Sequence, residues 1–313
     1  MSFENTAKKT DLKRVRIAGD DYFKMSNSDA LRPFFMSIVS DSDHWMFVSS
    51  NGGLTAGRRN AEYALFPYYT DDKITELAEV TGSKSIFRIK QGDETKLWEP
   101  FSCRQEGLYR ITRNLYKGIY GNKLIFEEEN HDLNLTFRYE WNSSDQFGFV
   151  RKATLVNNVE QDVHLELLDG IQNIMPHGVP SDLQNSASNL VDAYKRSELH
   201  PETGMGVYAL SAIIVDRAEP SEALKANTVW SQGLERPTHL LSSLQLDAFR
   251  KGAGVKEEMD VKAEKGAYFL VKELDLPAGK TQSWMLVANV NQNHAAVARL
   301  AHQIKNDPEL AKK

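Results

Sequence analysis

The sequence predicts a mainly β fold, an antiparallel super-sandwich of two large stacked sheets. Short segments in which apolar and polar side chains alternate follow one another along the chain, as in 85–90, 133–141 and 147–156. Alternation with a period of two is typical of strands with one buried and one solvated face. Turn-forming sequences such as Gln91-Gly92-Asp93 separate these segments. Because helical segments do not alternate with the strands, antiparallel sheets are favoured over a parallel α/β fold.

The expected strands follow one another in chain order. They cover 44–48, 85–90, 107–116, 123–128, 133–141, 147–156, 163–171, 205–215, 228–232, 239–249, 268–274 and 282–290. The pattern breaks over 177–204, where we expect a short helix at 187–199. A second helix is expected over 291–305, because apolar side chains recur there at helical spacing. We therefore divide the chain into a β super-sandwich domain, 1–290, and a C-terminal linker helix, 291–313.

The sequence is compatible with two arrangements of this terminal helix. It either docks on the sheet of its own chain or forms one piece of a longer or split assembly.

Composition excludes several classes of function. Lysine and arginine number 38 against 43 aspartates and glutamates, so the net charge of −5 offers no basic surface to a nucleic acid. No apolar run approaches the ~18 residues of a membrane span, and the N-terminus lacks the apolar core of a signal peptide, so we expect a cytoplasmic protein without membrane contact. Cys103 is the one cysteine, which excludes an internal disulfide and a multi-thiolate metal site. No dinucleotide or phosphate-loop motif is present, and we expect no cofactor.

A motif rich in glycine, arginine and tyrosine follows the first expected strand. It contains Gly52-Gly53, Arg58-Arg59 and Tyr68-Tyr69 and ends at Asp71-Asp72. Glycine permits tight turns or close approach of a ligand to the backbone, arginine offers a planar fork of donors, and tyrosine offers a flat face with a polar tip. These residue types suit a sugar or sugar-phosphate site. The alternative is a glycine-rich surface turn followed by solvated charges.

Under the first interpretation each residue of the motif has an expected role. Arg58 or Arg59 binds vicinal hydroxyls or a phosphate, and only one of the two reaches the site, since neighbours on an extended segment point opposite ways. Tyr68 or Tyr69, together with Trp98, stacks on a pyranose face, and Gly52-Gly53 lets the backbone come close.

Other residues are candidates for catalysis or metal binding. General acid–base chemistry on a sugar needs two groups of tuned pKa across one pocket, and His131, His164 and His177 with Glu166 or Asp169 supply the residue types. The alternative is that these histidines and carboxylates are solvated or satisfied structurally. Asp41-Ser42-Asp43-His44 is a compact set of hard ligands but is more typical of a turn leading into a strand, so no metal site is predicted.

Several stretches carry a resemblance to a known family. They are the Gly-Gly loop with its basic and aromatic continuation, 52–69, then Leu97-Trp98-Glu99-Pro100, the succession of strands over 109–158, and the closing strand and helix over 284–304. Together they resemble the N-terminal domain of the cellobiose and chitobiose phosphorylases, a glycoside phosphorylase family. The resemblance implies a galactose-mutarotase-like sandwich that normally precedes a helical barrel carrying the catalytic acid. It further implies that this chain lacks that acid and has no catalytic residue of its own.

The expected function is that of a carbohydrate-binding sandwich in a glycoside phosphorylase- or hydrolase-like system. It would shape a site for a β-linked oligosaccharide or sugar phosphate, with a helical-barrel catalytic partner, and would form a homodimer through the surface that such a partner leaves uncovered. The alternatives are a free-standing mutarotase-like epimerase or carbohydrate-binding module, and a structural oligomerisation domain.

Overall fold

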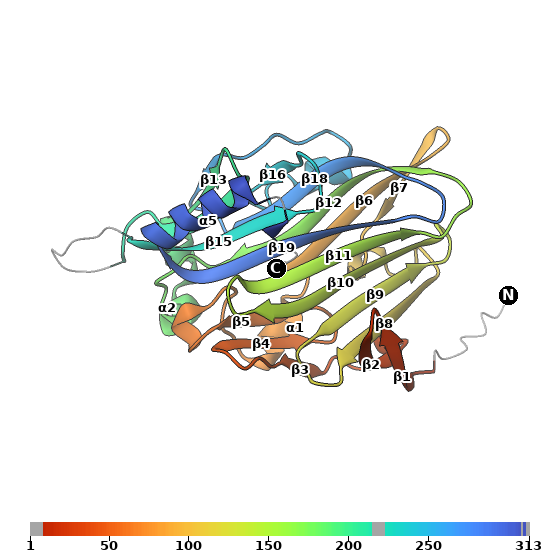
Figure 1. The fold of residues 1–313 in the computed structure, drawn as a ribbon, viewed down its shortest axis with the longest axis horizontal. Coiled ribbons are helices and arrows are strands. Elements are labelled where there is room, and N and C mark those ends of the chain that lie inside the picture. Colours follow the sequence, from red (N-terminus) through yellow and green to blue (C-terminus); the bar gives the residue numbers. More distant parts are fainter. Residues whose placement is uncertain (1–8, 215–222, 308, 311–313) are drawn as a thin grey trace.

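The protein is built mainly from antiparallel strands, as the sequence predicts (Figure 1). The computed structural model describes residues 9–214, 223–307 and 309–310. Every strand pair that joins these sheets is antiparallel. Across the described ranges no helix is both long and apolar enough to cross a membrane.

One layer is a single sheet of eleven strands. In spatial order it contains β1 (Asp11–Ile17), β2 (Asp20–Ser26), β8 (Ile111–Gly118), β9 (Leu124–Asn130), β10 (Leu135–Ser144), β11 (Gly148–Asn157), β19 (Thr281–Asn293), β15 (Lys225–Gln232), β14 (Met205–Leu210), β13 (Lys195–His200) and β17 (Asp260–Lys262). The last of these strands in chain order, β19, therefore lies between β11 and β15 in the interior of this sheet.

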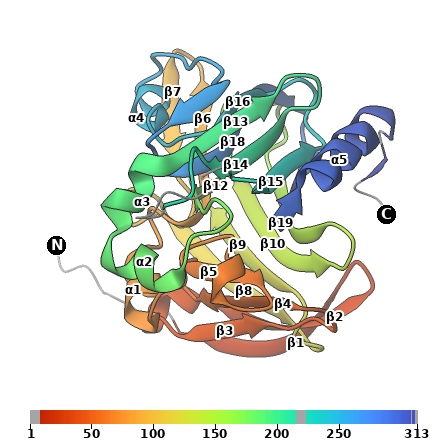
Figure 2. The same ribbon diagram turned by 90° about the vertical axis from the view of Figure 1, so that its left-hand side faces the viewer.

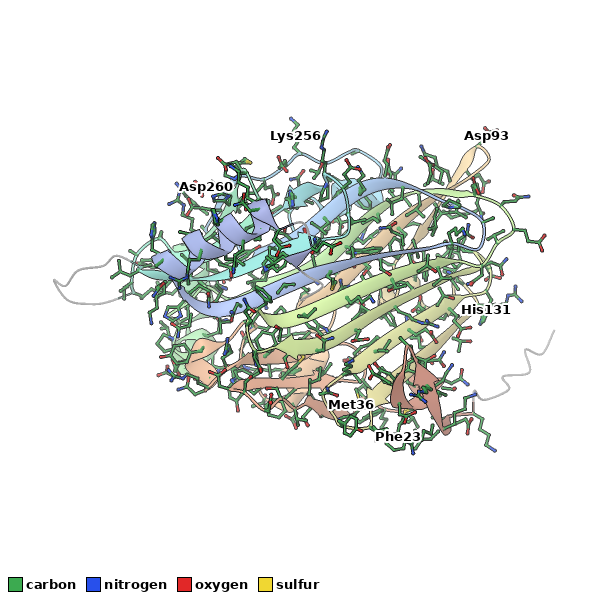
Figure 3. All side chains as sticks on the ribbon, viewed as in Figure 1. Phe23, Met36, Asp93, His131, Lys256 and Asp260 are labelled. Atoms are coloured by element: carbon green, nitrogen blue, oxygen red, sulfur yellow. The ribbon has the colours of Figure 1, made fainter. Side chains whose placement is uncertain are left out.

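Two smaller sheets form the opposite layer. The five-stranded sheet contains β16 (Thr238–Leu240), β18 (Gly266–Leu276), β12 (Val163–Ile174), β6 (Gly82–Gln91) and β7 (Glu94–Trp98). The three-stranded sheet contains β3 (Phe35–Ile38), β4 (His44–Ser49) and β5 (Leu54–Arg58). The β6–β7 hairpin carries Asp93 at the margin of the molecule, far from Met36 of the small sheet (Figure 3).

The main hydrophobic core fills the space between the two layers. Phe137 of the large sheet packs edge-on against Phe87 of the five-stranded sheet, with ring centroids 5.1 Å apart. Val48 of the small sheet is completely buried in the same cluster. Side chains of all three sheets thus share one core, and burial of this apolar surface supplies the main driving force for stacking the layers.

Within the described ranges the helices are α1 (Asp71–Glu76), α2 (Ser181–Ser186), α3 (Ser188–Tyr194), α4 (Leu246–Arg250) and α5 (His294–Asn306), with short 3-10 turns at Ser28–Ala30, Ala61–Tyr63 and Cys103–Gln105. The helix expected at 187–199 is wrong in its second half, because the chain enters β13 at Lys195. The strand expected at 239–249 is also wrong: only β16 is extended, and Leu246 and Phe249 then pack at helical spacing on the outer face of the five-stranded sheet.

Two further boundaries differ from the expectation. The strand expected from residue 107 begins at Ile111, because Gly107 takes a left-handed conformation within a turn, with φ of 77°. The strand expected over 205–215 ends at Leu210, and residue 215 lies outside the described ranges.

Helix α5 packs on the large sheet of its own chain. Its apolar face, which includes Val297, Leu300 and Ile304, contacts a cluster that contains Trp230 and Val287. The side chain of Asn293 caps the helix by accepting a hydrogen bond from the backbone N–H of Ala296 at 2.9 Å. Docking on its own sheet is therefore the arrangement observed, whereas the division of the chain at residue 290 stays a prediction.

Candidate functional site

The two glycines of the motif shape the turn between β4 and β5. Gly52 has φ of +96°, and a Cβ on Gly53 would lie 2.2 Å from the carbonyl oxygen of Ile74. The cavity beside Gly52 has a volume of about 20 Å³, which is room for about one water molecule. Close packing of the turn on α1 thus accounts for Gly53, and the turn conformation accounts for Gly52.

Arg58 lies at the end of β5, where two side chains hold its guanidinium. Its Nε donates to Asp43 Oδ1 at 2.7 Å, and its Nη1 donates to Asn289 Oδ1 at 3.2 Å. Its Nη2 makes no hydrogen bond to a described residue, so the oriented fork retains a donor for a ligand. Arg59 follows in a left-handed conformation, with φ of 61°, and its side chain is 66% exposed.

These two arginines line a cavity of about 230 Å³ that we call the Arg58 pocket. The residues lining it are Asp43, Arg58, Arg59, Tyr63, Val290, Asn291 and Gln292. Its volume lies below the ~300–1,000 Å³ of pockets for drug-sized ligands, so it suits a single sugar ring or phosphorylated unit. Two guanidinium groups face one carboxylate here, which makes the pocket electropositive.

One wall of the Arg58 pocket comes from the opposite end of the chain. Residues 290–292 belong to the end of β19, and the Asn291 backbone, with φ of 59°, is tied to Asn227 by a hydrogen bond from its N–H at 3.1 Å. The buried Asn291 Oδ1 has no hydrogen-bond partner among the described residues. A buried acceptor without a partner is unfavourable, and because Asn291 lines the pocket its side-chain amide is a candidate to bind a ligand hydroxyl after a small rotation. The end of the sandwich where β19 runs into α5 faces the viewer in Figure 2.

Two histidines flank the Arg58 pocket. The ring of His177 stacks on Tyr63 with centroids 5.8 Å apart, and burial together with the charge of Lys225 lowers the pKa of His177. His44, whose Nδ1 lies 2.6 Å from Ser42 Oγ, has its pKa lowered by burial and by Arg58, against the opposing charges of Asp43 and Asp145. Both rings are therefore held in the neutral form at pH 7. The segment Asp41–His44 is the turn into β4, as its sequence indicates.

The predicted aromatic residues are not gathered around the arginines. Tyr68 is 43% exposed and contacts Trp45 edge-on with centroids 5.5 Å apart. Tyr69 accepts a hydrogen bond from Gln184 Nε2 at 2.9 Å. Trp98 is 1% exposed, and its Nε1 donates to Glu128 Oε1 at 2.8 Å. The stacking role expected of Trp98 does not fit this position, because both faces of its ring are enclosed by the core.

The acid–base candidates are dispersed as well. Asp169 is fully buried in an ion pair with Arg151, whereas Glu166 pairs with Arg88. His164 Nδ1 lies 2.5 Å from Asp275 Oδ1, and the exposed His131 contacts Thr112 Oγ1 at 2.8 Å. None of the main cavities formed by the described residues is lined by His177 together with any of these groups. Among the residues that the structure describes, no set of three or more histidine, cysteine, aspartate or glutamate side chains is placed to hold a metal ion.

The sequence interpretation missed most of the Arg58 pocket. Asp43 was weighed as a metal ligand, and Tyr63 was read as part of the motif without a role. The sequence predicts a strand that ends at Val290 and a helix that begins at Asn291, whereas β19 continues to Asn293 and pairs with β15 along this stretch through contacts that no local pattern reveals. The signal available in the sequence was the cluster of three asparagines and a glutamine over 289–293, an unusual composition for the end of an apolar strand.

The sequence matches no protein-family model, and it has no significant match among curated proteins. Solved structures with a similar arrangement include a polysaccharide lyase, at 13% identity and a TM-score of 0.44, which covers 87% of this chain and 34% of the lyase. The Slr1438 protein of Synechocystis sp. PCC 6803 is 9% identical, with a TM-score of 0.45, and 84% of this chain and 97% of that chain are covered.

A putative aldose 1-epimerase from Klebsiella pneumoniae is 8% identical, with a TM-score of 0.36, and 96% of this chain and 92% of the epimerase are covered. This chain thus spans about a third of the lyase and almost all of the epimerase. Similarity at this level assigns neither a family nor an activity to the chain.

Proposed function

We propose that this chain is a carbohydrate-binding β-sandwich whose Arg58 pocket binds a phosphorylated sugar. One observation carries the proposal: Arg58 is held by Asp43 and Asn289 with a donor left over, beside the unpartnered Oδ1 of Asn291. An oriented guanidinium binds phosphate oxygens, and amide groups bind ring hydroxyls. The positive charge of the pocket favours the phosphorylated sugar over a neutral one.

The proposal also includes a catalytic partner of the sandwich. The resemblance to the glycoside phosphorylases favours a mutarotase-like sandwich that works beside a catalytic helical barrel. The dispersed positions of Glu166, Asp169 and His164 do not support the free-standing epimerase, because no pair of them faces a common cavity. A simple carbohydrate-binding module is consistent with the same pocket and differs only in lacking the barrel partner.

Isothermal titration of the purified chain with glucose 6-phosphate tests the pocket. We expect Arg58→Ala to weaken binding about tenfold or more, since a hydrogen bond to a charged group contributes about 1.5–3 kcal/mol. Arg14→Ala is the matched control, because Arg14 also pairs with an aspartate, Asp21, at 2.8 Å but lies on β1. Equal affinities of the Arg58→Ala variant and the unaltered chain would contradict the proposal.

A subunit interface is the second half of the proposed role. Phe47 and Tyr68 are each 43% exposed and both contact Trp45, which gives the small sheet an aromatic outer patch. Covering such a patch by a two-fold contact favours a homodimer. Sedimentation equilibrium is expected to show a dimer that Phe47→Ser weakens, and a monomer at micromolar concentration would rule this interface out.

A further inference from the structure

A second hollow lies beside the Arg58 pocket and carries an unusually exposed aromatic ring. Tyr120 is 81% exposed and sits in the turn between β8 and β9. The Gly118 N–H donates to Lys123 O at 2.9 Å, and the Gly121 N–H donates to Gly118 O at 2.8 Å. The Val39 N–H also donates to Gly121 O at 3.0 Å, which fixes this turn to the β3–β4 connection. The tyrosine ring is therefore presented to solvent on a rigid backbone.

This hollow, which we call the Tyr120 hollow, has a volume of about 510 Å³. The residues lining it are Val39, Ser40, Asp41, Tyr120, Asn122, Lys123, Asn142, Ser143 and Asp145. Hydroxyl, amide and carboxylate groups around one aromatic ring are the groups that bind the hydroxyls and the apolar face of a pyranose.

The charge of the Tyr120 hollow is opposite to that of the Arg58 pocket. Lys123 Nζ already lies 2.5 Å from Asp20 Oδ2, so its charge is compensated outside the hollow. The carboxylates of Asp41 and Asp145 remain and make the hollow electronegative. A phosphate group is repelled there, whereas an uncharged sugar ring can accept and donate hydrogen bonds freely.

The two hollows are neighbours across the turn that leads into β4. Asp41 lines one and Asp43 the other, and two residues of extended chain span at most about 7 Å. His44 lies between them: its ring packs edge-on against Phe149 at 5.0 Å, and Asp145 is close enough for its carboxylate to act on the imidazole. Phe149 in turn pairs with Ser143 of the Tyr120 hollow across β10 and β11.

We propose that the two hollows form one bipartite site, in which the Tyr120 hollow holds an uncharged sugar ring while the Arg58 pocket holds a phosphorylated ring of the same molecule. The ligand class is thus a phosphorylated disaccharide. This inference rests on the function proposed for the Arg58 pocket and adds the second subsite, its charge preference and Tyr120 as the residue that stacks on the sugar.

Isothermal titration with glucose 6-phosphate and cellobiose 6′-phosphate tests the bipartite site. We expect the unaltered chain to bind the disaccharide phosphate about tenfold more tightly, because the second ring adds contacts within one bound molecule. Tyr120→Leu should abolish this gain and leave the affinity for glucose 6-phosphate unchanged. Tyr120→Phe, which keeps the ring, should retain the gain.

The outcomes separate the two proposals. Equal affinities for the two probes, or a gain that survives Tyr120→Leu, would overturn the bipartite site while the Arg58 pocket stands. Failure of glucose 6-phosphate to bind, or binding that ignores Arg58→Ala, would overturn the proposed function and with it the bipartite site. Circular dichroism of each variant establishes that the fold is retained.

Discussion

Replacing Asp169 by alanine is expected to lower the free energy of unfolding by about 3–5 kcal/mol, because it leaves a buried guanidinium without its counter-charge. Asp169 and Arg151 are both 0% exposed, and they join the two layers through hydrogen bonds of 2.7 and 2.8 Å. Asp169 also accepts hydrogen bonds from Ser85 Oγ at 2.6 Å and Trp284 Nε1 at 2.6 Å. The substitution thus removes the acceptor for four donors within the core.

Urea denaturation followed by tryptophan fluorescence measures this loss. Asp93→Ala is the matched control: Asp93 is exposed in the β6–β7 hairpin, so no measurable change is expected (Figure 3). The double variant Arg151→Met/Asp169→Ala should recover part of the loss, since it no longer buries a lone charge. A loss below about 1 kcal/mol in Asp169→Ala would show that water reaches Arg151 and that the pair is not sealed in the core.

Replacing Gly53 by alanine is expected to destabilise the fold by about 3 kcal/mol, the upper part of the range for overpacking. The added Cβ would lie 2.2 Å from Ile74 O and 3.1 Å from Ile74 C, and backbone atoms cannot rotate away as a side chain can. Relief of the contact requires α1 to move from the β4–β5 turn, although Ile74 is 4% exposed and anchored in the core.

Gly118→Ala provides the control for the same chemical change. Neither glycine has a positive φ, and the nearest atom to a Cβ on Gly118 is Asn122 Oδ1 at 3.4 Å, an ordinary contact. Its melting temperature should therefore stay close to that of the unaltered chain. If Gly53→Ala melts at the same temperature as Gly118→Ala, close packing is not the reason for glycine at residue 53, and ligand approach returns as the explanation.

Strands such as β10 could be predicted because apolar and polar side chains alternate in the sequence, whereas β13 was missed because polar side chains occupy its buried positions. In β10 the alternation of buried and partly exposed side chains matches the sequence pattern closely. In β13 the buried positions are Lys195, Ser197 and Leu199, so polar side chains point inward. Lys195 is 2% exposed, and its Nζ lies 2.7 Å from the carboxylate of Asp192 three residues earlier, so a buried position is occupied by a side chain that the sequence pattern assigns to solvent.

The candidate site, like the strands, could be predicted only in part from the sequence. The arginine pair was identifiable because its chemistry is distinctive in the sequence, but the sequence did not choose between Arg58 and Arg59, and both line the pocket although only one was expected to reach it. Asn289, the hydrogen-bond partner of Arg58, lies 231 residues further along the chain, and only the position of β19 brings the two together. Trp98 resembled an exposed stacking platform because charges and a proline flank it, yet the buried Glu128 satisfies its indole N–H. In both cases a hydrogen-bond partner from another part of the sequence determines the environment of the side chain.

The position of β19 also determines when the protein can fold during synthesis. Its neighbours β11 and β15 have no contact with each other in the sheet, since β19 separates them. Thr154 of β11 and Ser283 of β19 are hydrogen-bonded although 129 residues separate them in the sequence. The large sheet can therefore form completely only after nearly the whole sandwich has been synthesised. Until then the facing edges of β11 and β15 remain open to pairing with other chains. The interval between synthesis of β11 and synthesis of β19 is thus the stage at which this architecture is most exposed to aggregation.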